Sequence, residues 1–189
     1  MGNTATNVST GKPKIAGAVF VAPKETTLPT DATTALDLTK FVCLGYVSED
    51  GLTNNNDMDV SAIKAWGGAI VYRSLTELDD NFALTLIESE NEDVLKAVYG
   101  DSNVTTEADG TIKVEVKAED PQERVWVFDL ALRGNRAKRI VIPDGAITSR
   151  GAITYNDSDA IGYEITVSAY PDSTGKTHTE YLEGASVSG

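Results

Sequence analysis

Residues 125–132 read VWVFDLAL and form the bulkiest apolar stripe in the chain. Two sets of side chains alternate along it: Trp126, Phe128, Leu130 and Leu132 on one face, with Val125, Val127 and Asp129 behind them. Successive side chains of a β-strand point to opposite faces, so this alternation predicts a strand with one heavily apolar face.

The same alternation recurs through residues 40–189, which we interpret as a single, mainly β domain. Three further apolar rows are Phe82, Leu84 and Leu86; Ile112, Val114 and Val116; and Tyr163, Ile165, Val167 and Ala169. Shorter strand candidates lie at 40–47, 69–74, 137–142 and 177–182. Gly-containing pairs such as Asp109-Gly110 and Gly134-Asn135 supply turns between them.

One segment has helical spacing instead. Ser89 and Glu92 form a capping box that predicts a helix starting at Ser89. Val94, Leu95 and Val98 then form an apolar stripe, and Gly100 ends the pattern. We therefore expect one short amphipathic helix packed on the flank of the β domain.

Residues 45–68 read GYVSEDGLTNNNDMDVSAIKAWGG and break the alternation. The first half is a polar turn mixture, and strand-like runs flank the segment on both sides. We therefore predict a long loop at about 48–67. Loops of this length are usually functional or disordered, and a disordered one would lack the Ile and Trp. We interpret it as an assembly loop that buries Val60, Ile63 and Trp66 against another copy of the chain.

The N-terminal segment, residues 1–39, is predicted to be a flexible tail followed by an extended arm. Residues 1–14 are rich in Thr, Ser, Asn, Gly and Lys, which is typical of a mobile terminus. The arm that follows could be disordered, but its Val19, Phe20 and Val21 favour docking on a partner surface. We therefore list these three as candidate interface residues.

The formal net charge is −13. This excess of carboxylates argues against stable binding to nucleic acid or to an anionic membrane surface. No apolar run of about 18 residues occurs, so no membrane-spanning helix is expected, and the start of the chain lacks the pattern of a signal peptide. We expect the protein to be made in a cytoplasm.

One basic cluster stands out in this acidic chain: Arg133, Arg136, Lys138 and Arg139. It surrounds the Gly134-Asn135 turn. Two interpretations remain open, a solvated surface or a contact with an acidic patch on a neighbouring subunit. Contact with nucleic acid is less favoured because no aromatic residues are interleaved with these cations.

No catalytic, metal or cofactor motif emerges, and we expect a protein that is not an enzyme and that needs no cofactor. The single cysteine, Cys43, excludes an internal disulfide and a cysteine-based zinc site, and its apolar surroundings predict a small buried side chain. The single histidine, His178, lies in a polar turn and is predicted to be exposed. The Asn/Asp run at 54–59 lacks the spacing of a calcium loop.

Pieces spread in order through the chain resemble the major tail tube proteins of long non-contractile phage tails, particularly those of actinobacterial phages. The resembling pieces are GKPKIAGAVFVAPKETTLPTDATTAL, FVCLGYVSEDGLT, AIKAWGG, FALTLIESENEDVLKAVYG, VFDLALRGNRAKRIVIPDG and YEITVSAYPD.

This resemblance implies a β-sandwich or barrel-like tail tube fold with one flanking helix, a long β–β loop and an extended N-terminal arm. It also implies hexameric rings that stack into a tube in the virion tail, with the loop 48–67 and the arm 12–30 making contacts between copies. The expected partners are the protein itself, a tape-measure protein and transiting double-stranded DNA in the lumen without specific binding, and tail-tip and tail-terminator proteins. The alternative is a non-enzymatic β-sandwich binding or decoration module of a virion.

Overall fold

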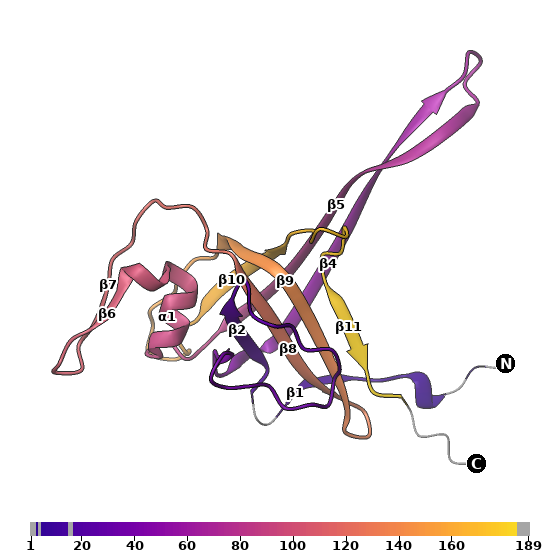
Figure 1. Cartoon of the computed structure of the whole chain (residues 1–189). Coiled ribbons are helices and arrows are strands. Elements are labelled where there is room, and N and C mark those ends of the chain that lie inside the picture. The colour runs from indigo at the N-terminus through magenta and orange to yellow at the C-terminus, as the bar shows by residue number, and fades with distance from the viewer. Residues whose placement is uncertain (1–2, 4, 15–16, 185–189) are drawn as a thin grey trace.

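The computed structural model describes residues 3, 5–14 and 17–184, and it is built mainly from antiparallel β-strands (Figure 1). The mainly β prediction is therefore confirmed. The elements are β1 (Gly11–Pro13), β2 (Val19–Pro23), β3 (Val42–Cys43), β4 (Val47–Lys64), β5 (Ile70–Leu86), α1 (Glu92–Tyr99), β6 (Val104–Thr106), β7 (Ile112–Val114), β8 (Arg124–Leu132), β9 (Arg136–Arg150), β10 (Tyr163–Ala169) and β11 (Thr179–Leu182).

Nine of the strands form one sheet in the order β3-β2-β8-β9-β10-β5-β4, with β1 added beside β8 and β11 beside β9. The remaining two, β6 and β7, form a separate short ribbon near α1 (Figure 1). The predicted apolar row at 112–116 ends early, because β7 stops at Val114 and Val116 is exposed.

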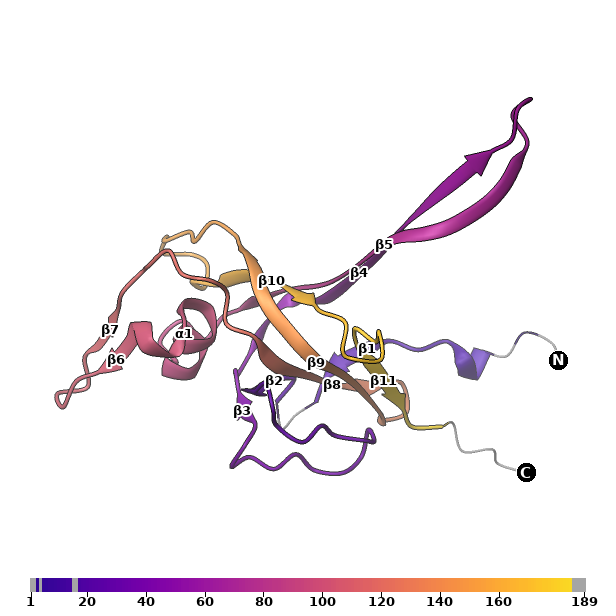
Figure 2. The ribbon, with the colours of Figure 1, turned by 45° about the horizontal axis from the view of Figure 1, so that its top comes forward.

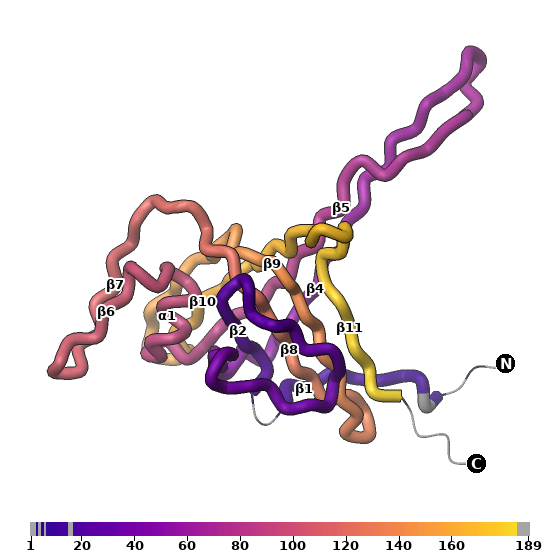
Figure 3. Tube along the Cα trace, in the orientation of Figure 1, coloured from indigo at the N-terminus to yellow at the C-terminus, as the bar shows by residue number. Residues whose placement is uncertain are grey.

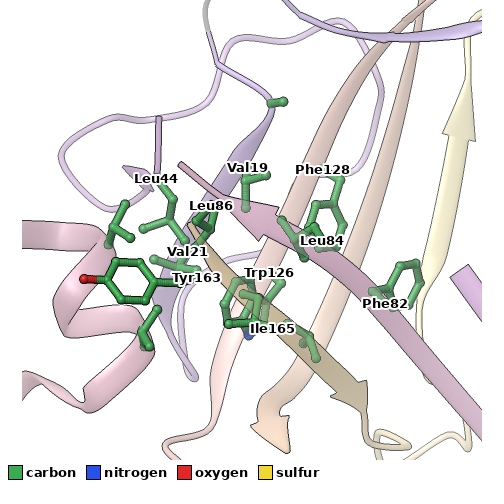
Figure 4. Packing of buried hydrophobic residues seen from close by; sticks show 14 of the residues in the cluster. Val19, Val21, Leu44, Phe82, Leu84, Leu86, Trp126, Phe128, Tyr163 and Ile165 are labelled. Atoms are coloured by element: carbon green, nitrogen blue, oxygen red, sulfur yellow. The ribbon is translucent and has the colours of Figure 1, made fainter. Parts of the chain in front are cut away.

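The large sheet curls strongly on itself. The rings of Phe82 on β5 and Phe128 on β8 stack with their centroids 5.5 Å apart. Those strands are separated by β9 and β10, so in a flat sheet they would lie about 14 Å apart, at about 4.8 Å per strand step. The inner face therefore closes around its own side chains, as in a barrel, and Figure 4 shows Phe82, Phe128, Trp126 and Ile165 converging there.

The helix α1 packs against this inner core as expected, with Val94, Leu95 and Val98 buried. Its predicted start is wrong: the N-cap is Asn91, whose side chain accepts a hydrogen bond from the backbone N–H of Asp93 at 3.0 Å. Asn caps a helix as well as Ser does. The helix ends before Gly100, which has a φ of 99° that favours glycine.

The predicted N-terminal arm is largely part of the fold. The strand β2 pairs with both β8 and β3, and Val19, Phe20 and Val21 are each at most 4% exposed. Because their side chains fill the core of their own chain, they offer no surface to a second copy, which corrects their assignment as interface residues. Within the tail, residues 5–7 form a short 3-10 helix and residues 11–13 form β1 against β8. Residues 1–2 and 4 of the tail and residues 15–16 of the arm lie outside the described part.

The outer face of β2, β8 and β9 forms a second, smaller core with Phe20, Val127 and Val141. Next to it, the guanidinium of Arg139 forms two hydrogen bonds with the carboxylate of Asp129, at 2.6 and 2.7 Å. The same guanidinium also donates to the backbone carbonyls of Asp31 and Thr34, which fastens the loop 24–41 over this face. Arg139 is 1% exposed, so its assignment to a surface cluster is wrong.

The segment predicted as a loop at 48–67 is instead one side of a long β-hairpin (Figures 1 and 2). The strand β4 pairs with β5 almost from end to end, and the chain reverses only at 65–69. The Asn/Asp run has low strand propensity, and both faces of the outer hairpin are exposed, so no buried face imposes an apolar alternation on the sequence.

The buried ion pair gives a first prediction. Replacing Arg139 with Ala should lower the free energy of unfolding by about 3–5 kcal/mol, because buried Asp129 loses both guanidinium hydrogen bonds and keeps only the partly exposed Lys14 ammonium, 3.7 Å away. Urea denaturation of the variant measures this loss. The matched control is Arg133→Ala in the neighbouring exposed turn, which should change the free energy by less than about 0.5 kcal/mol. Equal effects of the two substitutions would contradict the assignment.

Candidate functional site

The feature that sets this fold apart is the outer half of the β4–β5 hairpin, which projects from the body (Figure 3). The last pair that β5 makes with β10 joins Asn81 to Ser168, so from Asp80 outward the hairpin is a two-stranded ribbon. It extends for about 30 Å if the strand rise is applied to residues 56–64. An isolated two-stranded ribbon is at best marginally stable in water, so it is expected to gain support from a partner.

The hairpin tip, defined as residues 60–75, is apolar and fully accessible. Val60, Ile63 and Trp66 are 56%, 59% and 106% exposed, so the structure leaves all three available, as the sequence interpretation required. Register adds residues that the sequence interpretation missed, since Leu75 lies opposite Val60 and Tyr72 opposite Ile63. The sequence predicts a strand at 69–74, as observed. The local pattern does not show, however, that this strand pairs with the segment predicted as an assembly loop.

The charges on the hairpin are sorted along its length. The tip carries Lys64 and Arg73 and no carboxylate. Between tip and body lies the acidic shaft, where Asp57 lies opposite Asp79 and Asp59 opposite Glu77, all of them exposed. Like charges placed directly across a strand pair destabilise it. The shaft is thus a strongly hydrated spacer, and the tip differs from it in both polarity and sign of charge.

The root of the hairpin is held by a buried carboxylate. Asp80 is 2% exposed, accepts a hydrogen bond from the Asn54 side chain at 2.9 Å and lies 2.5 Å from Nδ1 of His178. Burial alone would raise the pKa of Asp80, but hydrogen bonds from Thr177, Asn54 and other neighbours outweigh it and lower that pKa. His178 also packs edge-on against the Phe82 ring, so its predicted exposure is wrong.

Comparison with known proteins decides the family. The sequence model of the phage tail tube protein family matches residues 5–186, which is nearly the whole chain. The chain belongs to this family. It is therefore a structural protein of a phage tail, as the resemblance implied.

A solved structure similar to this tail tube protein is the tube-terminating cap of an anti-feeding prophage. The alignment has a TM-score of 0.46 and 9% sequence identity, and covers 97% of this chain and 100% of that chain. No curated protein sequence matches the chain.

The basic cluster of the tail tube protein is divided by the fold. Arg133 is exposed in the β8–β9 turn, and Arg136 beside it is half-buried. Lys138 forms an ion pair with Glu180 of β11 at 2.8 Å, and Arg139 is the buried anchor already described. Only Arg133 and Arg136 remain available as a pair for contact with a neighbour.

We also searched the described ranges 3, 5–14 and 17–184 for metal sites and membrane-spanning helices. There, no group of three or more His, Cys, Asp or Glu is arranged to hold a metal ion, and no helix is long and apolar enough to cross a membrane. Cys43 is a half-buried free thiol that packs against the smaller core.

The hairpin root gives a second prediction. Because folding lowers the pKa of Asp80 below its ordinary 3.8, ionised Asp80 stabilises the fold above pH 3.8. That contribution is lost as the pH falls through the lowered folded-state pKa. Replacement of Asp80 with Asn should therefore lower Tm strongly near pH 7, and the difference from wild type should shrink below about pH 4.

Thermal unfolding followed by circular dichroism between about pH 3 and 7 measures this difference. The matched control is Asp120→Asn, which should leave Tm nearly unchanged across this pH range, because the Asp120 side chain is exposed and accepts no hydrogen bond within the described structure. A Tm difference for Asp80→Asn that stays constant with pH would contradict the proposed role of the ionised carboxylate.

Proposed function

We propose that this tail tube protein polymerises into stacked hexameric rings that form the phage tail tube, through which double-stranded DNA passes during ejection. One observation carries the proposal: nine large apolar side chains are exposed together on the projecting hairpin. They are Met58, Val60, Ile63, Trp66, Ile70, Val71, Tyr72, Leu75 and Leu78. The register places these side chains on both faces of the ribbon and at its turn. Large apolar side chains rarely gather on an exposed element of a monomeric protein, so they are expected to be buried against a partner.

The position of the hairpin supports assembly with other copies of the same chain. It leaves the body at one edge of the large sheet, since β4 is the last strand in the order. An edge strand presents unpaired backbone groups that a neighbouring strand can join. A contact between two different patches of the same protein closes into a ring or continues as an open stack, as a tube requires.

The outward face of β4, β5 and β10 suits a lumen that conducts DNA. Register places on this face Thr53, Asn55, Asp57, Asp79, Asn81, Ala83, Thr85, Glu164, Thr166 and Ser168. None of these is Lys or Arg, and the chain as a whole carries a net charge of −13. Such a surface repels phosphate groups and gives DNA no site to bind. We propose that this face lines the lumen around the tape-measure protein and, later, the genome.

The remaining partners follow from the same proposal. A tube made of this subunit, assembled in the host cytoplasm, must meet tail-tip proteins at one end and terminator proteins at the other. The alternative, a binding or decoration module of a virion, predicts a protein that stays a monomer or small oligomer at every concentration. Size-exclusion chromatography and microscopy of the concentrated protein distinguish the two.

The hairpin tip gives a third prediction. Replacing Trp66 with Ala should raise the protein concentration needed for tube growth by at least about 30-fold, since a buried aromatic anchor is commonly worth about 2 kcal/mol or more. Negative-stain electron microscopy of a concentration series measures this threshold. The circular dichroism spectrum should not change, because Trp66 makes no contribution to the core.

The matched control is Tyr155→Ala, which removes an exposed aromatic side chain from a different loop and should leave the threshold unchanged. Normal tube growth by the Trp66→Ala variant would show that this residue is not an anchor. Absence of any large assembly of the wild-type protein at all concentrations would contradict the proposed function itself.

A further inference from the structure

The curled sheet leaves an open groove along its seam. The sheet does not close, so β1 and β8 form one wall and β4 and β5 form the other, around a volume of about 560 Å³. Val19, Leu84 and Phe128 form an apolar floor, and the half-buried Leu52 and Leu130 lie higher on the two walls. This volume is within the range of about 300–1,000 Å³ that is typical of binding pockets.

The rim of the groove is acidic on the β4 side, whereas the opposite wall carries the exposed Lys12 of β1. Between the pairs Val47 with Leu86 and Leu52 with Leu84, β4 contains extra residues that leave the ladder as a bulge. This bulge carries Glu49 and Asp50, both exposed, at the edge of the groove. Bulges at sheet edges interrupt strand pairing and redirect side chains. Here the bulge places two carboxylates beside an apolar depression.

The hairpin tip has the complementary chemistry. Its exposed surface is apolar and includes Trp66, and its only charged residues, Lys64 and Arg73, are both positive. Residues 52–64 of β4 run away from the body of the molecule for about 40 Å (Figure 2), so the tip cannot reach the groove of its own chain. The occupant must therefore come from another molecule.

We propose that the hairpin tip of one copy docks into the seam groove of the next copy. Trp66 enters the apolar groove, while Lys64 and Arg73 meet the carboxylates of Glu49 and Asp50 at its rim. The proposal rests on the proposed tube function and deepens it, because it names the two different surfaces that each subunit would use. A large aromatic side chain suits this role, since it buries about 150–250 Å² and needs little ordering.

Charge reversal tests the pairing without changing the core. Reversing the rim with Glu49→Arg and Asp50→Arg should raise the concentration threshold for tube growth at least about tenfold, because like charges then face each other. Reversing the tip with Lys64→Glu and Arg73→Glu should do the same. A chain that carries all four substitutions pairs an acidic tip with a basic rim, so its threshold should return to within about threefold of wild type.

Cysteine cross-linking supplies a second measurement. In a Cys43→Ala background, Ala65→Cys at the tip and Asp50→Cys at the rim should form disulfides between copies and give a ladder on a non-reducing gel. The matched control pairs Asp50→Cys with Ser158→Cys, an exposed position on a different loop, and should give no ladder. Circular dichroism checks that each variant folds.

The outcomes separate this inference from the function on which it rests. Rescue in the fourfold variant together with the tip–rim ladder supports docking in the groove. If the wild-type protein forms tubes but neither rescue nor the ladder is seen, the groove is not the receptor and the tube function stands. If the wild-type protein never assembles, both the function and the inference are overturned.

Discussion

The curl of the large sheet is the constraint on which the rest of this structure depends. It is fixed by aromatic packing across the inner face, where Phe128 stacks against Phe82 on one side and against Trp126 on the other. The indole N–H of Trp126 donates to the carbonyl of Gly145 at 3.1 Å, so even the polar atom of this large side chain is satisfied. The same curl gives the chain a closed core, an open seam beside β4, and a direction for the projecting hairpin.

The hairpin combines a firmly held root with an unsupported end. At the root, Asp80 is fixed by Asn54 and His178, and Ser168 of β10 donates a hydrogen bond to the side chain of Asn81. Beyond it, the strands have no third neighbour in the described structure and show apolar residues to solvent. A segment that is costly to leave exposed, yet held in a defined direction, is suited to contact another subunit.

Charged residues of opposite sign are separated along the hairpin and its root. The acidic shaft and the polar outward face of β4, β5 and β10 carry no cations, which suits the lumen surface that we propose for this face. The hairpin tip carries only positive charges, and the bulge carries the negatively charged Glu49 and Asp50. In the proposed docking, these fixed charges would set partner choice and register more than affinity, and the apolar contact of Trp66 would supply the affinity.

Local pattern by itself determined the mainly β class, the core rows of β5, β8 and β10, and the buried stripe of α1, because each depends on neighbours along the chain. It also identified Trp66 as an unusual residue for a connection. Only the tertiary structure decided which strands and which side chains lie next to each other. The strand β4 was missed because its partner is β5 and neither outer face is buried, so no alternation was required. Val19–Val21 were recognised as apolar, but the neighbouring β8 places them inside, and Arg139 is buried because Asp129 lies opposite it across the β8–β9 register. These pairings join segments that are far apart in the sequence, so no single stretch of the sequence contains a pattern that reveals them.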